Sequence, residues 1–478
     1  MNLLEITTFS IYFFALLIIV FLLSKKQKSD TQFVLGNRSL NFYLTALSAH
    51  ASEMGGWLFM GYPLLIFTTG IFGSWAAIGL VVFMFLNWQF IAPKIRRITG
   101  EYNCLTLNAY FEKKFNDKTI TIRTLSSIIS LIFFITYIAA GLVGLGYLVE
   151  TLFHINYLFG ITVGFFIIIL YVYIGGYNTV AWIDLVQGFF LLAVVLFIPI
   201  YLLPKIGGFE SIYKTLELKK MSTSLFGNFS FKKFIEIIFI SCGWGLGYFG
   251  QPHIITKFMG IKNIKDMNKA KYLGMTWQAL ALGGATLIGL IGIVYFSNGL
   301  QNPEMVAVDI VQKTLHPILV GLVLCAILAA TTNVIAAQVL VVASSMSEDL
   351  YKKLIRPKAT HKELLKISRV SIVIVALISY IVAFFKPATI YKIVLYSWSG
   401  LGASFGPLLL LSLYTNKINK TGAIWGILLG AITAGLWPLI DSHINVISIP
   451  PVIVGFITSL IGIYLGTFLS KNKSNANI

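Results

Sequence analysis

A carboxylate interrupts an otherwise apolar run near the start of the sequence, in the stretch HASEMGGW at residues 50–57. If this run crosses a membrane, an ionised Glu53 costs about 3 kcal/mol at the centre of the bilayer. Glu53 therefore needs an ion, a proton pathway or a basic partner. A structural pair with His50 is the alternative. The two glycines that follow predict a break in the helix, and free backbone groups at membrane depth are tolerated only where they line a cavity or bind a ligand.

A second unusual stretch, SCGWGLGYFGQP at residues 241–252, holds four glycines and a proline within ten residues. Close helix packing explains one or two membrane glycines, but not two clusters that also carry polar groups. On a regular helix Trp244, Tyr248 and Pro252 lie on one face. Aromatic rings attract a cationic nitrogen, and the N-terminus of a broken helix accepts a carboxylate. The stretch therefore predicts a pocket for a compact cyclic or aliphatic zwitterion.

The spacing of the two stretches carries further information, because they lie about 190 residues and five apolar segments apart. Five segments later the chain runs in the opposite direction through the membrane. Two broken helices in corresponding, inverted positions are typical of transporters whose repeats enclose a binding site at the membrane midplane. We therefore predict a secondary transporter with an inverted repeat.

The composition places both stretches in a membrane. The chain has 478 residues, 57% of them hydrophobic and 11% charged, and its mean hydropathy is +0.84. Soluble domains carry about a quarter charged residues, so a water-soluble enzyme is excluded. The net charge of +18 indicates basic loops that set orientation and not a nucleic-acid partner. We expect an all-α polytopic membrane protein with one transmembrane domain over residues 1–478. The lipid bilayer surrounds this domain.

Uncharged or nearly uncharged stretches predict about 13 transmembrane helices. Their ranges are 6–23, 41–70, 71–92, 125–149, 157–174, 185–203, 234–256, 272–296, 317–346, 370–385, 393–414, 423–440 and 451–469. We divide the chain into a first peripheral helix and loop (1–40), a first repeat (41–204), a second repeat (232–414) and two peripheral helices (421–470).

Basic residues predict the orientation of the chain. With the N-terminus outside and the C-terminus in the cytoplasm, most of the 36 Lys and Arg residues fall in inside loops, as the positive-inside rule requires. Arg38, Asp184 and Arg369 lie near the inner ends of segments. Orientation anchoring or a gating role fits the two arginines, and a gate or a helix cap fits Asp184.

Other classes of function lack their sequence signals. The chain has no HExxH, P-loop or dinucleotide fingerprint, which argues against an enzyme and against a redox cofactor. No predicted loop is long enough to hold a signalling domain, which argues against a sensor or receptor. We identify no obligate protein partner. A channel is the remaining alternative, and occluding broken helices favour alternating access instead.

Four stretches resemble the sodium/solute symporter family, most closely its sodium/proline symporters. They are LGNRSLNFYLTALSAHASEMGGWLFMGYP, GWGLGYFGQPHI, QVLVVASSMSEDLYK and YSWSGLGASFGP, in the family's order between about residues 36 and 430. The resemblance implies a LeuT-like inverted-repeat core and sodium-coupled uptake of L-proline across the inner (plasma) membrane. It also implies substrate contacts at Tyr137, Trp244, Tyr248 and Pro252, and coupling or gating roles for Arg38, Asp184 and Arg369.

The sodium site implied by the resemblance is incomplete in this chain. Ala51, Met54 and Ala330 fit its backbone ligands, but its two hydroxyl positions fall on Asn333 and Val334, and its aspartate is replaced by Glu53. From the resemblance we still predict sodium as the coupling ion. Proton-coupled or ion-independent transport of proline, a betaine or another small zwitterion is the alternative.

Overall fold

The computed structural model describes residues 29–153, 155–227, 230–441, 443 and 448–475, together with scattered positions before residue 19. The first predicted segment, 6–23, lies outside the continuously described residues. The described backbone is helical and contains no strand, apart from one isolated bridge between Leu40 and Ile261. Because backbone groups in lipid must be bonded within the chain, uncharged runs of this length form helices.

Each of the other twelve predicted segments corresponds to helix in the structure. The long elements are α6 (Trp75–Leu86), α9 (Thr121–Phe153), α10 (Tyr157–Leu202), α14 (Met267–Tyr295), α16 (Pro317–Ser344), α17 (His361–Phe384), α18 (Ile390–Tyr414), α19 (Lys420–Asp441) and α20 (Pro451–Asn475). Shorter ones are α2 (Asp30–Leu35), α7 (Ala92–Glu101), α8 (Leu107–Lys114), α11 (Gly208–Leu218), α13 (Pro252–Gly260) and α15 (Val306–Thr314).

Within the described residues, nine helices are long and apolar enough to cross a membrane. Helix α3 is shorter than a membrane span because the chain breaks after it. The first predicted segment, 6–23, lies outside the continuously described residues. The total of thirteen spans therefore stays a prediction.

The segment predicted over 41–70 is broken, as expected. Helix α3 (Phe42–Ala51) begins at Asn41, whose side chain accepts a hydrogen bond from the Leu44 amide at 3.0 Å. Residues 52–55 then leave the helical path, and the chain resumes as α4 (Gly56–Phe59) and α5 (Gly61–Thr69). The polar HASEMGG sequence thus places four non-helical residues inside an apolar segment.

The segment predicted over 234–256 is broken as well. Helix α12 (Phe231–Gly245) passes into a 3-10 turn, η5 (Leu246–Gly250), and an extended Gln251 separates this turn from α13. The glycines of η5 are required by the approach of α18, because a Cβ on Gly247 would lie 1.9 Å from Nε1 of Trp398. The absence of side chains at the glycines of η5 therefore explains both the break in the helix and the close packing of α18 against it.

A third interruption separates two predicted segments. The ranges 157–174 and 185–203 both fall within α10, in which two helices meet at a kink where Gly176 adopts φ 63° and ψ −173°. Only glycine occupies this region of backbone space readily, so the Gly175–Gly176 pair sets the position of the kink.

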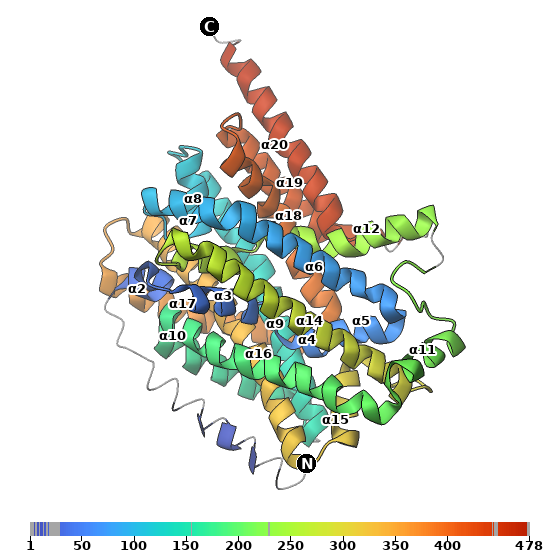
Figure 1. Ribbon diagram of the computed structural model, residues 1–478. Coiled ribbons are helices and arrows are strands. Elements are labelled where there is room, and N and C mark those ends of the chain that lie inside the picture. Colours follow the sequence, from blue (N-terminus) through green and yellow to red (C-terminus); the bar gives the residue numbers. More distant parts are fainter. Residues whose placement is uncertain are drawn as a thin grey trace.

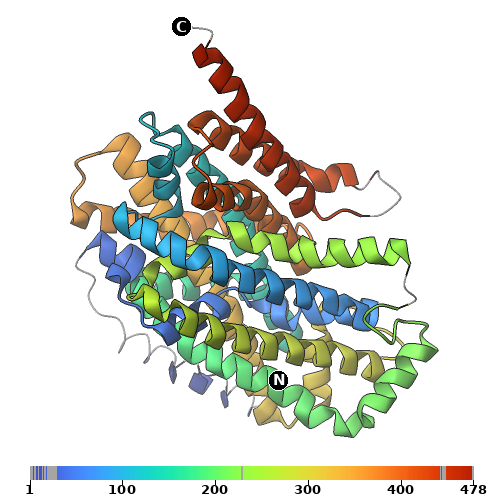
Figure 2. The same ribbon diagram turned by 45° about the horizontal axis from the view of Figure 1, so that its top comes forward.

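Around the two breaks, α3 packs on α10 and α14, and η5 packs on α18, whereas α12 extends to the edge of the molecule (Figure 1). Helices α19 and α20 pack on each other and on α18, and α20 projects beyond the rest of the bundle (Figures 1 and 2). Helix α11 lies at the opposite end of the bundle from α2 and α8 (Figure 1). We call the end that carries α2 and α8 the basic end, which is the predicted cytoplasmic side.

Candidate functional site

The two broken helices meet through Glu53 and Tyr248. The Tyr248 hydroxyl donates to Oε1 of Glu53 at 2.6 Å and accepts from Nε2 of Gln278 at 2.8 Å. All three side chains are buried. A carboxylate on the first broken helix is thus held by the second broken helix and, through Gln278, by α14.

Aromatic rings surround this contact. Trp57 lies 4.8 Å from Trp244, and Tyr248 meets Trp398 edge-to-face at 5.1 Å, measured between ring centroids. Nε1 of Trp398 donates to the Trp244 carbonyl oxygen at 2.8 Å, which fixes the indole of α18 against the broken helix. Of these rings, Trp244 and Tyr248 are predicted substrate residues, whereas Trp57 and Trp398 were not foreseen.

A cavity opens beside Glu53 in two adjoining chambers that share Glu53, Trp57, Tyr137 and Val394. One chamber extends between α9 and α16. The other is lined by Trp244, Tyr248 and Trp398. The structure therefore brings three of the four predicted substrate residues to one cavity. Aromatic walls with a few polar groups are typical of small-molecule sites.

Pro252 lies elsewhere. The helix is not regular between Tyr248 and Pro252, since η5 and the extended Gln251 intervene, so the three residues do not share one face. Pro252 instead lines a second cavity together with His253, Thr256 and Lys257. A substrate role for Pro252 stays a prediction, and it would involve this second cavity.

The predicted sodium residues lie around the non-helical residues 52–55. Backbone amides of the described residues donate to none of the carbonyl oxygens of residues 51–54, which include those of Ala51 and Met54. A Cβ on Gly55 would lie 2.8 Å from Cγ2 of Val334 and 3.5 Å from the Ala330 carbonyl oxygen. The broken helix thus faces α16 at the expected positions.

On α16 the oxygen atoms differ from the predicted set. Thr331 and Val334, three residues apart, both line the chamber beside Glu53, whereas Asn333 is buried and does not. The Thr331 hydroxyl would lie 3.0 Å from a Cβ on Gly56. The Thr331 hydroxyl, which donates to the Ile327 carbonyl oxygen at 2.9 Å, is therefore an oxygen on this face of α16 in addition to the predicted positions Asn333 and Val334. Among the described residues, no cluster of His, Cys, Asp and Glu suits a transition metal.

Asp184 is part of a buried ion pair. Its Oδ2 atom lies 3.0 Å from Nζ of Lys257 and accepts from the Ser48 hydroxyl at 2.5 Å. These three residues belong to α10, α13 and α3, so the pair joins the parts of both broken helices nearest the basic end. This role of Lys257 was not foreseen, because the residue directly follows the predicted segment 234–256.

Arg38 braces the basic end through backbone carbonyls. Its guanidinium donates to the carbonyl oxygens of Met259 at 2.9 Å and of Thr99 and Cys104 at 2.8 Å. Burial and the neighbouring Arg96 lower the pKa of Arg38 to about 10, so it remains charged at neutral pH. Arg38 thus connects α7 and the turn after it to the end of α13.

Arg369 does not join either cluster. Its guanidinium lies 5.2 Å from the ring centroid of Tyr173 on α10, and its Nε atom has no hydrogen-bond partner among the described residues. The structure therefore places the predicted gating residues at three separate points, and their roles stay predictions.

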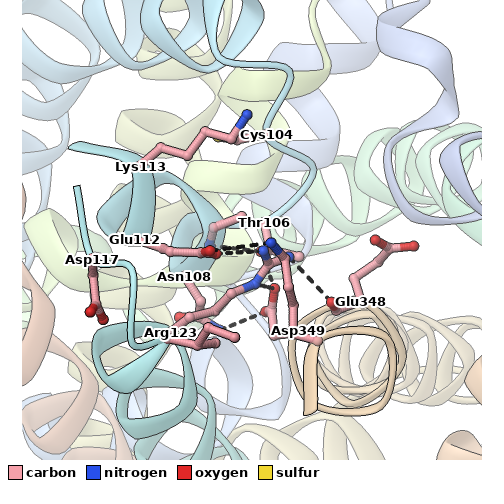
Figure 3. Close-up of polar contacts among 12 residues, drawn as sticks. Cys104, Thr106, Asn108, Glu112, Lys113, Asp117, Arg123, Glu348 and Asp349 are labelled. Carbon is pink, nitrogen blue, oxygen red and sulfur yellow. Dashed lines mark hydrogen bonds and ion pairs between the residues drawn. The ribbon is translucent and has the colours of Figure 1, made fainter. Parts of the chain in front are cut away.

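A buried polar network at the basic end was not foreseen (Figure 3). Arg123 on α9 donates to Asp349 Oδ1 at 2.7 Å and to Glu112 Oε2 at 2.6 Å. Thr106 donates to the same Asp349 oxygen at 2.7 Å, and Asn108 donates to the other at 2.9 Å. Asp349 belongs to the π-helix η8 (Ser345–Ile355), which continues α16. The network thus fastens α8 and the start of α9 to the end of α16.

Known proteins are similar to this chain over nearly its whole length. The model of the sodium:solute symporter family matches residues 33–430. The high-affinity proline transporter PutP of Bacillus subtilis is 36% identical over 465 residues, 96% of this chain and 97% of that protein. The sodium/proline symporter of Escherichia coli is 36% identical over 481 residues, 98% of this chain and 94% of that protein.

A solved structure shares the fold. The substrate-bound outward-open state of a Na⁺-coupled sialic acid symporter aligns over 98% of each chain, with a TM-score of 0.83 and 18% sequence identity. At this identity the likeness bears on the fold alone. The all-α architecture with two broken helices, expected to be LeuT-like, is confirmed.

Proposed function

The chain belongs to the sodium:solute symporter family, and on that premise we propose that it imports L-proline by sodium-coupled symport with alternating access. It is a transporter and not an enzyme. The observation that supports the proposal most strongly is the cavity between the two broken helices, where Glu53 and Tyr248 meet among aromatic rings. Midplane sites between broken helices are where secondary transporters bind their cargo.

Proline as the substrate is supported by the relatives named above and by the chemistry of the cavity. Proline combines an apolar five-membered ring with a cationic nitrogen. Trp57, Trp244 and Tyr137 offer flat apolar surfaces for the ring, and their faces attract the cation. The second cavity, which includes Pro252, would receive the substrate on its way to the basic end.

Sodium as the coupling ion is supported by the non-helical backbone. The carbonyl oxygens of Ala51, Met54 and Ala330 would supply hard oxygen ligands. Val334 supplies none, and the Thr331 hydroxyl on the same face of α16 would substitute for it. We expect a weaker sodium site than one with two hydroxyl ligands, because an alkali ion needs several oxygens.

Alternating access would move the two predicted repeats, 41–204 and 232–414, relative to each other. The Asp184–Lys257 pair joins the first repeat to α13 in the second repeat. Arg38, which directly precedes the first repeat, also binds α13 through the Met259 carbonyl oxygen. They would therefore act as contacts that close the basic end. The guanidinium of Arg369 on α17 lies over the aromatic ring of Tyr173. Arg369 would act as an orientation anchor or as a gate.

The chain would reside in the plasma membrane as a multi-pass protein, with its N-terminus outside and its C-terminus in the cytoplasm. The positive-inside rule supports this orientation. Proline, sodium and the lipid bilayer are the proposed partners. We propose no cofactor and no obligate protein partner.

The test is uptake of radiolabelled proline by proteoliposomes with sodium and pH gradients imposed separately. We expect an inward sodium gradient to drive accumulation above the external concentration. Accumulation driven by the pH gradient and indifferent to sodium would establish proton coupling instead. Uptake that never exceeds the external concentration under either gradient would establish a facilitator.

A further inference from the structure

Glu53 carries an oxygen atom that the described part of the chain leaves without a partner. Its side chain is 1% exposed. Oε1 accepts from the Tyr248 hydroxyl, whereas Oε2 has no hydrogen-bond partner among the described residues. Burying an unpaired carboxylate oxygen is unfavourable, so this position is built for a partner that the chain itself does not supply.

The basic residues nearby do not fill that role. The only basic side-chain nitrogen within 4.0 Å of Glu53 among the described residues is Nδ1 of His50, 3.8 Å from Oε1 and beyond hydrogen-bonding distance. Nε2 of His50 accepts a hydrogen bond from Trp88 at 3.0 Å. The histidine is thus held in place by Trp88, and among the described residues no lysine or arginine nitrogen lies within 4.0 Å of the Glu53 carboxyl group.

The side chain that carries this unpartnered oxygen lines both chambers of the cavity. Glu53 lines each of them, as do Trp57 and Tyr137, while Trp244 lines one. A carboxylate among aromatic faces is the environment that an organic cation requires. The carboxylate is bonded toward η5, whereas Gly55, two residues later, abuts Val334 and the Ala330 carbonyl on α16. The carboxylate and the proposed sodium ligands therefore have different neighbours.

We propose that Glu53 is the residue that binds the cationic nitrogen of the substrate, and that it selects zwitterions whose nitrogen carries hydrogen atoms. This inference rests on the proposed function and narrows its substrate class. A secondary ammonium such as that of proline donates to Oε2 while its ring contacts Trp57 and Trp244. A quaternary ammonium fits the aromatic walls equally well, but it has no N–H group to donate and leaves Oε2 unbonded. The site therefore binds proline in preference to its N,N-dimethyl derivative and to betaines.

The experiment measures equilibrium binding of proline and of N,N-dimethylproline to the purified full-length chain at saturating sodium. We expect the native chain to bind proline at least about tenfold more tightly than N,N-dimethylproline. This factor corresponds to the usual contribution of one hydrogen bond to a charged group. Glu53→Gln keeps an acceptor for Tyr248 and removes the charge. This variant should weaken proline binding by about tenfold or more and dimethylproline binding by less than about threefold, so that the preference is lost.

Two further variants control for damage to the fold. Glu304→Gln neutralises another buried carboxylate, which accepts from the Tyr391 amide at 3.2 Å outside the cavity, and should leave both affinities unchanged. Glu53→Asp keeps the charge on a shorter arm. It should retain part of the preference for proline even if Glu53→Gln fails to fold.

The outcomes separate the inference from the function on which it rests. If native protein binds neither ligand, the proposed function is wrong and the inference fails with it. If native protein binds proline and Glu53→Gln changes only the half-saturating sodium concentration, Glu53 is an ion ligand and the inference alone is overturned. Equal native affinities for proline and dimethylproline also overturn it.

Discussion

At the scale of single residues, Tyr248 connects three functions of the site. Its hydroxyl holds Glu53, accepts from Gln278, and its ring packs on Trp398. The residue is fully buried. A substitution of Tyr248 therefore disturbs the contacts with Glu53, with Gln278 on α14 and with Trp398 at the same time. Its effect on transport cannot be assigned to one of these contacts. Trp244 is the better probe of the wall alone, because its ring makes no hydrogen bond that orients Glu53.

Trp244→Ala should raise the KM for proline by about tenfold, because one desolvated aromatic face that attracts the cation is lost. The measurement is the concentration dependence of proline uptake at fixed sodium. Trp425→Ala is the matched control, since Trp425 lies on the peripheral helix α19 and its side chain is 48% exposed. An unchanged KM in well-expressed Trp244→Ala would remove this residue from the binding cavity.

The sodium ligands on α16 can be restored in this chain. Asn333→Ser combined with Val334→Thr should lower the half-saturating sodium concentration by threefold or more, roughly the value of a modest ligand contact. Threonine has the shape of valine, so its hydroxyl would lie where Cγ2 of Val334 now faces Gly55. The readout is sodium-dependent proline uptake. A native chain that already saturates at low millimolar sodium would show that Thr331 or other oxygens complete the site.

At the scale of elements, the breaks in the helices were predictable from the sequence because they follow from composition. Glycines, a proline and polar residues at membrane depth occur at residues 50–57 and 241–252, and the structure breaks both helices there. The chain also turns at Gly176, where the two helices of α10 meet. The predicted segments 157–174 and 185–203 lie on either side of this turn.

Contacts between elements could not be predicted in the same way. Pro252 shares a face with Trp244 and Tyr248 only on a regular helix, and η5 together with the extended Gln251 rotates it into another cavity. Lys257 and Asp184 lie 73 positions apart, and nothing local pairs them. Trp398 joins the cavity through the packing of α18 on η5, and Trp57 joins it on α4, which contacts α16 and α18. These relations depend on how helices pack, which the periodicity of one segment does not determine.

The network around Arg123 should stabilise the basic end. Arg123→Met leaves the buried Asp349 without its cation, which costs about 3–5 kcal/mol, whereas Glu112 keeps Lys353 at 3.2 Å. We expect the Tm of the purified protein to fall by several degrees, and Asp349→Asn in the same chain to recover part of the loss. Arg97→Met is the matched control, because Arg97 and Glu101 form an exposed pair that contributes little. Equal Tm values for the two arginine variants would contradict a structural role for the network.

At the scale of the whole molecule, orientation is the property that composition predicts most directly. Cysteines introduced between residues 205 and 227 should react with impermeant thiol reagents added outside intact cells. Cysteines introduced between residues 352 and 366 should react only after permeabilisation. Native Cys104 and Cys325 are buried and Cys242 is half-buried, so a background that lacks Cys242 gives the clearest signal. The reverse labelling pattern would overturn the predicted orientation, and labelling of both loops from the same side would overturn the predicted odd number of spans between them.

Coupled transport is tested most directly by movement of the ion in response to the substrate. Proteoliposomes are prepared with equal sodium on both sides and no membrane potential, and proline is then added outside. An inward proline gradient should drive accumulation of ²²Na⁺ above its external concentration, and Trp244→Ala should require about tenfold more proline for the same effect. Entry of proline down its gradient with no accompanying ²²Na⁺ would contradict sodium symport.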